Sequence, residues 1–507
     1  MKLITHKTEF KHTALLTLIS IVMSAQVIAA PKYAAKVPAN IQTPNEVNTK
    51  LLGKLKYFDG TPTQETVTKA YDFIDTARAA QAFLTGIPIA SIYAFLEGLK
   101  EVGAAPGDLI LFENLMDART LLLTPNTTTP YAFAEVNLKA GPMIVVIPPM
   151  VLGGLDNEFF LHVNDFGITG TDAGKGGKYL IIGPGYKGKI PKGYNVYHSK
   201  TYRNWLFLRT FVKNGDVAAS TLGLRKSFNI YPLAQASKPP EQKVINVSGK
   251  QFNTIHANNF DFFNEINEVI QYEPADALDP ETVGLFAAIG IKKGQPFAPD
   301  KRMKKILTDG VAIGNATARA NLFAPRNKAV YFYPGKRQWF SPFAVVGYDF
   351  YKNGERTLDL RTMFHYYATG ITPAMSVPRI GKGSVYEIGT KDKQGNYLDG
   401  GKNYVITLPA PVPAANFWSF IVYDGQTRSI LETDQKFGGV DNKNPNLKTN
   451  KDGSYTVYFG PKVPKGHEGN WVQTMPNKSY NVLLRIYGPL KPWFDRSWMP
   501  GDFELIK

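Results

Sequence analysis

The sequence predicts an α+β, mainly β fold with two related β-sandwich, jelly-roll-like domains, an N-terminal helical segment and a helical insert between the domains. Three observations predict this class. The chain has 507 residues, too many for one hydrophobic core. Its composition, 44% apolar, 12% aromatic and 20% charged, is that of a globular protein. Short β-branched and aromatic runs bounded by Gly, Pro and Asn alternate with stretches of helical periodicity.

The first residues have the pattern of a secretory signal peptide. Basic residues at the start precede an apolar run over 13–27 and the small residues Ala29 and Ala30. We therefore expect a signal peptide over 1–29 and a periplasmic or secreted protein. No later segment reaches 18 consecutive apolar residues, so no transmembrane segment is expected after cleavage. The chain contains no cysteine, which excludes disulfides and thiolate chemistry.

The net charge of +16 predicts an anionic neighbour, such as an anionic glycan or another envelope component. Lys and Arg are spread thinly, so we expect no nucleic-acid partner. Neither a cofactor nor an oligomeric state follows from the sequence.

Periodicity divides the mature chain into four regions. The segment 30–106 reads as helical, with a break expected at Gly86-Ile87-Pro88. Strand signals fill 107–250, helical periodicity returns over 251–325 as a connecting region, and strands resume over 326–507.

The two strand-rich regions repeat several landmarks in the same order. Each later segment below resembles the earlier one in residue type and spacing, which predicts two copies of one supersecondary plan. The pairs are Ile144–Pro148 with Val405–Pro409, Phe159–Asp165 with Phe417–Asp424, Gly177–Pro184 with Gly453–Pro461, Pro191–Gly193 with Pro464–Gly466, and Trp205–Arg209 with Val482–Arg485.

Familiar catalytic motifs are absent. The sequence contains no Gly-x-Ser-x-Gly, and His467-Glu468 has no second His in metalloprotease register. The His residues of the mature chain are scattered, so no metal ligand is predicted. A metal site assembled from distant His and carboxylates remains an open alternative.

The polar residues of greatest interest lie at the ends of the repeated strands. Asp165 and Asp424 each follow an aromatic-rich strand, and Arg209 and Arg485 each end an apolar run. A carboxylate and a guanidinium at strand ends frame a pocket for a polar ligand, or else form a buried pair that holds the fold.

Two further segments carry candidate binding groups. Trp418, Tyr423 and Arg428 lie close to Asp424, and aromatic faces beside acidic and basic groups suit carbohydrate. Asn126 belongs to a hydroxyl-rich run, Thr124–Tyr131, which presents groups to a ligand or satisfies a turn.

Several of these segments resemble two domain families. Thr124-Pro-Asn with Pro130-Tyr131, and Gly183-Pro-Gly-Tyr-Lys-Gly, resemble the DUF1254 family. Pro413–Ser419 and Arg485-Ile-Tyr-Gly-Pro resemble the DUF1214 family. The resemblance implies an exported bacterial protein with mainly β domains in this order, and it implies no catalytic residue.

Two functional hypotheses follow. The first is an exported hydrolase acting on glycan or cell-envelope material, in which Asp165 and Asp424 act as acid and base. Asn126, Arg209, Trp418, Tyr423, Arg428 and Arg485 would bind the substrate. The alternative is a non-catalytic ligand-binding or envelope-interaction protein. Product formation distinguishes the two.

Overall fold

The structure is a computed structural model that describes residues 32–212 and 215–506. The predicted signal peptide lies outside the described residues. The chain divides into two compact units, Met1–Ala70 and Tyr71–Lys507. In the first unit, β1 (Glu46–Thr49), β2 (Gly53–Phe58) and β3 (Thr61–Pro62) form an antiparallel sheet. The periodicity of the sequence predicted only helix in this region.

A single helix, α1 (Gln64–Glu101), follows and continues through Pro88. The break expected at Gly86-Ile87-Pro88 is therefore wrong. Gly86 allows a close approach to another helix, because a Cβ there would lie 2.9 Å from Cδ1 of Ile266. Ile87 and Ile89 are buried beside it, so tertiary packing maintains the helix across the proline.

Residues 107–250 form a two-sheet sandwich. The larger sheet has the order β14-β4-β6-β12-β8-β9, and the smaller has the order β11-β10-β7-β13. The strands are β4 (Leu109–Leu111), β6 (Tyr131–Asn137), β7 (Met143–Ile147), β8 (Leu152–Asn157), β9 (His162–Gly167), β10 (Gly177–Ile182), β11 (Asn195–His198), β12 (Arg203–Arg209), β13 (Asn229–Pro232) and β14 (Val244–Asn246). Buried side chains from both sheets, including Val145, Leu155 and Leu206, form one core between them.

The C-terminal region forms a second sandwich. Its sheets have the orders β18-β24-β20-β21 and β23-β22-β19-β25. The strands are β18 (Ser384–Gly389), β19 (Asn403–Leu408), β20 (Ala414–Asp424), β21 (Gly439–Asp441), β22 (Tyr455–Gly460), β23 (Trp471–Gln473), β24 (Tyr480–Pro489) and β25 (Glu504–Ile506). Trp418, Phe420, Val457 and Leu484 lie in the core between these sheets.

The two sandwiches have the same strand order and pairing directions, which confirms the internal repeat. The series β11-β10-β7-β13 matches β23-β22-β19-β25, with one parallel pair at the same place in each. The series β6-β12-β8-β9 matches β18-β24-β20-β21, antiparallel throughout. One landmark is wrong: Phe417–Asp424 lies in β20, whose counterpart is β8, whereas Phe159–Asp165 runs into β9. Asp165 and Asp424 are therefore not equivalent.

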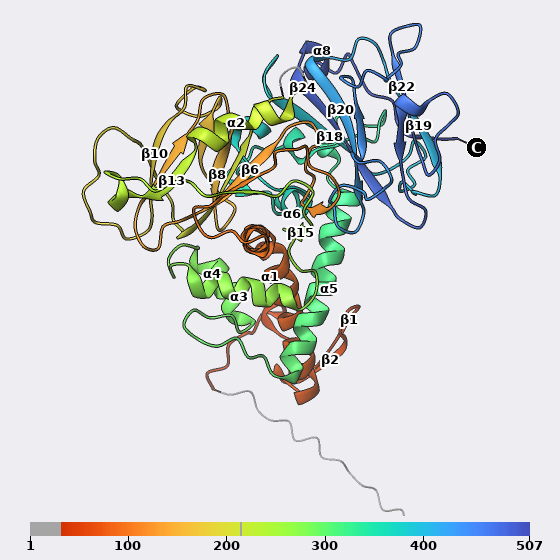
Figure 1. The fold of residues 1–507 in the computed structure, drawn as a ribbon. Helices are drawn as coiled ribbons and strands as arrows, with labels where there is room; N and C mark the ends of the chain where they lie inside the picture. The colour runs from red at the N-terminus through yellow and green to blue at the C-terminus, as the bar shows by residue number, and fades with distance from the viewer. Residues whose placement is uncertain (1–31, 213–214, 507) are drawn as a thin grey trace, which may run out of the picture. The chain divides into compact units, whose positions relative to one another are not determined.

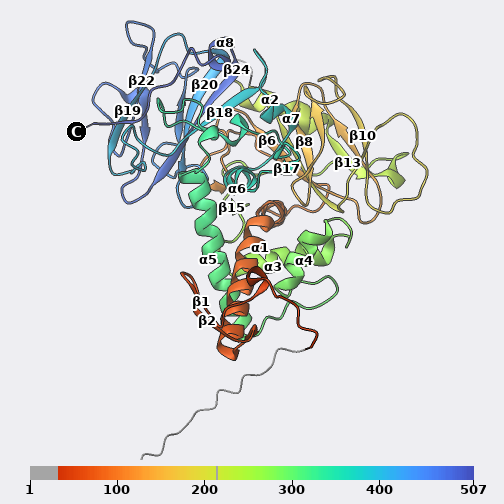
Figure 2. The same ribbon diagram turned by 180° about the vertical axis from the view of Figure 1, so that it is seen from behind.

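Helices complete the second unit around a third core. Buried residues of α1, α3, α5 and α6 join residues from one sheet of each sandwich in this core, among them Phe133, Trp205 and Leu483. The helices are α2 (Val217–Ser227), α3 (Asp261–Tyr272), α4 (Pro280–Ala288), α5 (Lys301–Phe323), α6 (Leu358–Tyr367), α7 (Pro373–Ser376) and α8 (Lys491–Phe494). Short strand pairs are β5 (Thr120–Leu121) with β15 (Phe252–Asn253), and β16 (Tyr351–Lys352) with β17 (Glu355–Arg356). Figures 1 and 2 show α6 between the two sandwiches. The predicted α+β class is confirmed.

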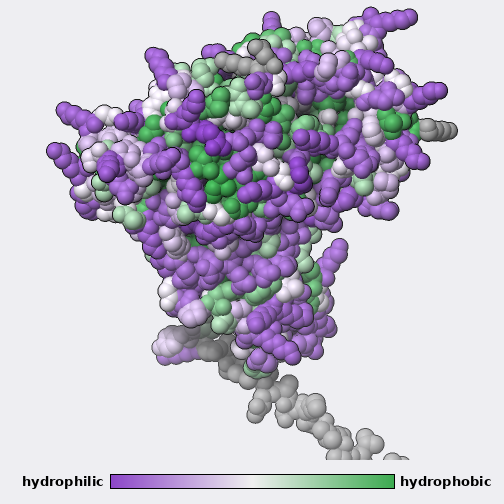
Figure 3. Space-filling view, viewed as in Figure 1, coloured by the Kyte–Doolittle hydropathy of each residue, from purple (hydrophilic) through white to green (hydrophobic). Residues whose placement is uncertain are grey.

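By length and composition, one described helix could cross a membrane, and it is α1. Within its apolar window 78% of the residues are buried inside the structure, as in a core helix. Figure 3 shows a mostly hydrophilic face, with an apolar area where β6 and β8 lie in Figure 1.

Candidate functional site

A cavity of about 110 Å³ lies between the β14-β4-β6-β12-β8-β9 sheet of the first sandwich and the β18-β24-β20-β21 sheet of the second. Strands β6 and β12 contribute from the first sandwich, and β18 and β24 contribute from the second. Segments 122–126, 341–343 and 363–375 complete the wall. The lining is mainly aromatic and aliphatic, with Phe133, Trp205, Phe207, Phe343 and Phe364 among its rings. None of the described residues that line it is Asp, Glu or His.

The internal repeat supplies equivalent side chains to this cavity. Arg209 on β12 pairs with Tyr131 on β6, and Arg485 on β24 pairs with Tyr386 on β18. All four residues line the cavity. Because the paired strands occupy the same positions in the two sandwiches, each repeat contributes one Arg–Tyr pair to one shared site.

The alternation of strand side chains explains how each Arg reaches the cavity. On β12, Trp205 and Phe207 line the cavity with Arg209, whereas Leu206 and Leu208 lie in the sandwich core. On β24, Leu483 and Arg485 face the cavity, while the residues between and beside them lie in the second core.

The two guanidinium groups differ in their hydrogen bonds. Arg485 donates from Nη1 to the Tyr423 hydroxyl at 2.6 Å and from Nη2 to the Thr124 carbonyl at 2.8 Å. Arg209, in contrast, makes no side-chain hydrogen bond or ion pair with another described residue. The ionisable groups that act on it electrostatically are tyrosines and Arg485, none of them a carboxylate. A partly buried guanidinium that has no acceptor within the described chain favours an anionic ligand.

Asn126 lines the cavity, but it also organises its own loop. Its Oδ1 accepts hydrogen bonds from the backbone N–H and hydroxyl groups of Thr128 and Thr129, at 2.8–3.0 Å. Its Nδ2 donates to the Tyr131 hydroxyl. The same loop contacts the second repeat, where the Tyr423 hydroxyl donates to the Pro125 carbonyl at 2.6 Å. The hydroxyl-rich run thus satisfies a turn and joins the two halves.

Three other predicted binding residues lie outside the cavity lining. Trp418 is buried in the core of the second sandwich. The Tyr423 hydroxyl accepts a hydrogen bond from Arg485 and so positions its guanidinium group. Arg428 lies with its guanidinium 4.1 Å from the centre of the Tyr366 ring and donates to the Tyr366 carbonyl at 3.1 Å. Burial lowers the pKa of Arg428 to about 10. Arg428 therefore attaches the 424–430 turn to α6.

Asp424 has structural partners. One oxygen accepts hydrogen bonds from the backbone N–H groups of Gln426 and Thr427, at 2.7 and 2.8 Å. The other pairs with Lys478 at 2.6 Å. Although burial alone would raise the pKa of Asp424, these partners lower it overall. A carboxylate held ionised in this way is a poor general acid near neutral pH.

We expect Asp424→Ala to lower the free energy of unfolding by about 1–3 kcal/mol, because two partly buried N–H groups lose their acceptor and Lys478 loses its partner. Asp452→Ala is the matched control, since Asp452 accepts from Ser454 in a similar but exposed turn. Its cost should be smaller. Equal stability of Asp424→Ala and the wild-type protein in urea unfolding would show that Asp424 is not structural.

Asp165 belongs to a separate cluster on β8 and β9. His162 lies between two carboxylates, with Nε2 3.5 Å from Asp165 and Nδ1 3.6 Å from Asp156. Burial raises the pKa of Asp165 to about 6. Asp156 also accepts from the backbone N–H of Ile371 at 3.0 Å. Asp165 and Asp424 therefore lie in different sheets without a common partner, and neither lines the cavity. The structure does not form the predicted acid–base pair.

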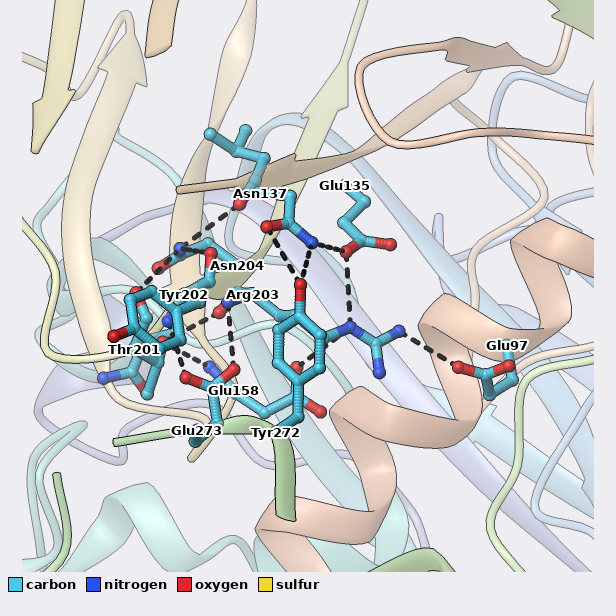
Figure 4. A network of polar contacts seen from close by, with 12 residues as sticks. Glu97, Glu135, Asn137, Glu158, Thr201, Tyr202, Arg203, Asn204, Tyr272 and Glu273 are labelled. Atoms are coloured by element: carbon cyan, nitrogen blue, oxygen red, sulfur yellow. Dashed lines mark hydrogen bonds and ion pairs between the residues drawn. The ribbon is translucent and has the colours of Figure 1, made fainter. Parts of the chain in front are cut away.

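Buried charge also gathers around Arg203, as Figure 4 shows. Arg203 lies 3.1 Å from Glu97, 3.3 Å from Glu135 and 3.9 Å from Glu158. Glu273 accepts from the backbone N–H groups of Tyr202 and Arg203. Among the described residues no cluster of three or more His, Asp or Glu is arranged to hold a metal ion. This network joins α1, β6, β12 and α3, and we regard it as structural.

Sequence reasoning identified Asn126, Arg209 and Arg485, and it missed the tyrosines and the aromatic wall. Tyr131 begins β6 and Tyr386 lies within β18, and each of these strands comes before the first repeated landmark of its sandwich. Extending the repeat comparison to those strands would have found them. The aromatic residues of the wall carry no such signal, because their alternation also fits an ordinary core.

The fold defines the chain as a duplicated two-sheet β-sandwich protein. Residues 107–232 match the family described as protein of unknown function DUF1254, and residues 383–491 match that described as protein of unknown function DUF1214. The chain thus carries a DUF1254 region followed by a DUF1214 region, as the resemblance predicted. No protein of curated function matches the sequence.

Two solved structures are similar to this chain. The VPA0106 protein from Vibrio parahaemolyticus is 18% identical, with a TM-score of 0.52 over 85% of this chain and 100% of its own. An uncharacterised protein from Burkholderia cenocepacia is 13% identical, with a TM-score of 0.39 over 87% of this chain and 96% of its own. The Vibrio structure supports the fold alone.

Proposed function

We propose that this protein binds a small anionic ligand in the cavity between its two sandwiches. The observation that carries this proposal is the guanidinium of Arg209, which borders an apolar cavity and has no acidic or hydrogen-bonding partner among the described residues. The Arg209 side chain is partly buried, and a cation of this kind is stabilised when an anion fills the space in front of it. The second cation, Arg485, adds to the positive potential there.

This proposal favours the ligand-binding hypothesis over the hydrolase. General acid–base hydrolysis needs a group that exchanges protons near the scissile bond. The described lining provides guanidinium, hydroxyl and amide groups, with no carboxylate or imidazole. A volume of about 110 Å³ also fits a small molecule better than a glycan chain.

Export is part of the proposal. The basic start and apolar run at the N-terminus support a protein that meets its ligand in the periplasm or outside the cell. Cell fractionation tests this placement, and recovery of the full-length, uncleaved protein from the cytoplasm alone would contradict it.

A thermal-shift screen tests the binding function. We expect small carboxylates or other anions to raise the melting temperature, because a ligand that binds only the folded state stabilises it by mass action. At one hundred times Kd the gain is about 2.7 kcal/mol. Uncharged amides of the same shape should have little effect.

Arg209→Met should remove this response, whereas Arg225→Met should retain it. Arg225 is an exposed residue paired with Glu113, so it controls for the loss of one positive charge. A stabilising anion whose effect is equal in the wild type and Arg209→Met would contradict the proposed site. Product formation from any bound compound would instead support the hydrolase hypothesis.

A further inference from the structure

The size of the cavity limits the ligand. Its volume of about 110 Å³ is somewhat smaller than that of an apolar cavity of about 150 Å³ that holds benzene. The enclosed space therefore accommodates about one six-membered ring. Because the cavity is partly open, a fatty acid, a disaccharide or a nucleotide would extend beyond it into solvent.

The walls select a flat apolar body. Trp205 and Phe207 stack with ring centres 4.7 Å apart and an interplanar angle of 25°. Both lie on the same face of β12 as Arg209, at alternate positions, and Phe343 and Phe364 also line the cavity. Aromatic rings gain from offset-stacked and edge contacts with such walls. A sugar of this size would bring several hydroxyl groups against a mainly apolar wall, whose polar groups, among them Ser341 and Thr369, are fewer than its rings and aliphatic side chains.

The two guanidinium groups of the cavity leave a free binding position for one anionic group of a ligand. Arg485 already donates to the Tyr423 hydroxyl and the Thr124 carbonyl, with a longer contact of 3.4 Å to the Pro125 carbonyl. Arg209 is the repeat-equivalent residue whose donors are unused within the described chain. Its planar fork matches the two oxygens of one carboxylate. A phosphate monoester presents more charge and more acceptor oxygens than one free guanidinium satisfies.

We infer that the ligand is a single-ring aromatic monocarboxylate, with its carboxylate on Arg209 and its ring against Trp205 and Phe207. This inference rests on the proposed function and narrows it to one class of compound. Arg209 and the neighbouring Phe207 then determine specificity, the first for charge and the second for the ring.

Isothermal titration with benzoate as the probe tests the inference, with acetate, cyclohexanecarboxylate, benzamide, phenyl phosphate and inorganic phosphate as comparisons. We expect benzoate to bind most tightly, and benzamide to bind roughly ten- to hundredfold more weakly because the charge-assisted hydrogen bonds are lost. Phe207→Leu should weaken benzoate binding and leave acetate binding unchanged. Arg209→Met should weaken both.

Arg209→Lys provides a second variant that keeps the charge and removes the fork. We expect intermediate benzoate affinity from it, and circular dichroism checks that each variant is folded. If acetate or phosphate binds through Arg209 and benzoate binds no better, the inference fails and the proposed function stands. If no anion in the panel binds, or Arg209→Met changes nothing, both fail.

Discussion

Replacing Arg203 by Met should lower the free energy of unfolding by roughly 3–5 kcal/mol, the cost of removing one partner from a buried ion pair. Arg203 is the cation of the network in Figure 4. Both carboxylate oxygens of Glu158 are buried without a hydrogen bond, and Arg203 is the positive group beside them. Glu135 would lose the same partner. Urea unfolding at pH 7.5 measures the loss.

Arg302→Met is the matched control, because Arg302 also contacts two carboxylates, Asp72 and Asp75, at 2.7 and 2.9 Å. Its side chain is 46% exposed, so solvent screens the pair and the cost should be far smaller than that of Arg203→Met. The Arg203→Met penalty should also shrink as pH falls, since protonation removes the uncompensated charge. Similar costs for the two variants would show that burial does not strengthen the Arg203 network.

The variant Glu387→Gln should be more stable than the wild-type protein above pH 7. Glu387 is fully buried in the second sandwich, and burial raises its pKa to about 7. Its Oε1 accepts from the Tyr333 hydroxyl at 2.8 Å and from Trp493 Nε1 at 2.7 Å, while Oε2 has no partner. Glutamine retains the acceptor and removes the buried charge.

The sign follows from proton binding. The folded pKa of Glu387 lies above its unfolded value of 4.5, so the folded state holds the extra proton between these values. The stability that this group contributes is complete below pH 4.5 and is lost as pH rises through about 7. By pH 8 the wild-type protein should have lost about 3 kcal/mol that the variant keeps. Near pH 4 the two should be equal.

Glu273→Gln provides the contrasting case. Its pKa is also raised by burial to about 7, but both of its oxygens accept backbone N–H groups. In Glu273→Gln the side-chain NH2 group would face one of these backbone N–H groups, so two donors would meet and one hydrogen bond would be lost. We therefore expect this variant to be less stable than the wild-type protein even at pH 8. Urea midpoints for both variants from pH 4 to pH 8 make the comparison. A Glu387→Gln difference that is independent of pH would contradict the assigned pKa.

Much of the fold could be predicted because the alternation of apolar and polar residues over a few positions indicates each strand. Alternation along β12 and β24 predicts half-buried strands, and the recurrence of Trp205–Arg209 as Val482–Arg485 predicts a repeat. The match of Phe159–Asp165 with Phe417–Asp424 was wrong, because aromatic residues before an Asp occur in two strands that are not equivalent in the repeat. The continuity of α1 through Pro88 was missed because packing against α3 decides it.

The candidate site divides in the same way. The residue types that end the repeated strands can be read from the sequence, and they placed Arg209 and Arg485 among the candidates. Which of the predicted residues meet depends on how the sheets pack in the folded chain. Sheet pairing brings the two Arg–Tyr pairs to one cavity, whereas Asp424 accepts hydrogen bonds from its own turn and Asp165 lies beside His162. Strand periodicity is a short-range property, but the meeting of two sheets depends on contacts between residues hundreds of positions apart.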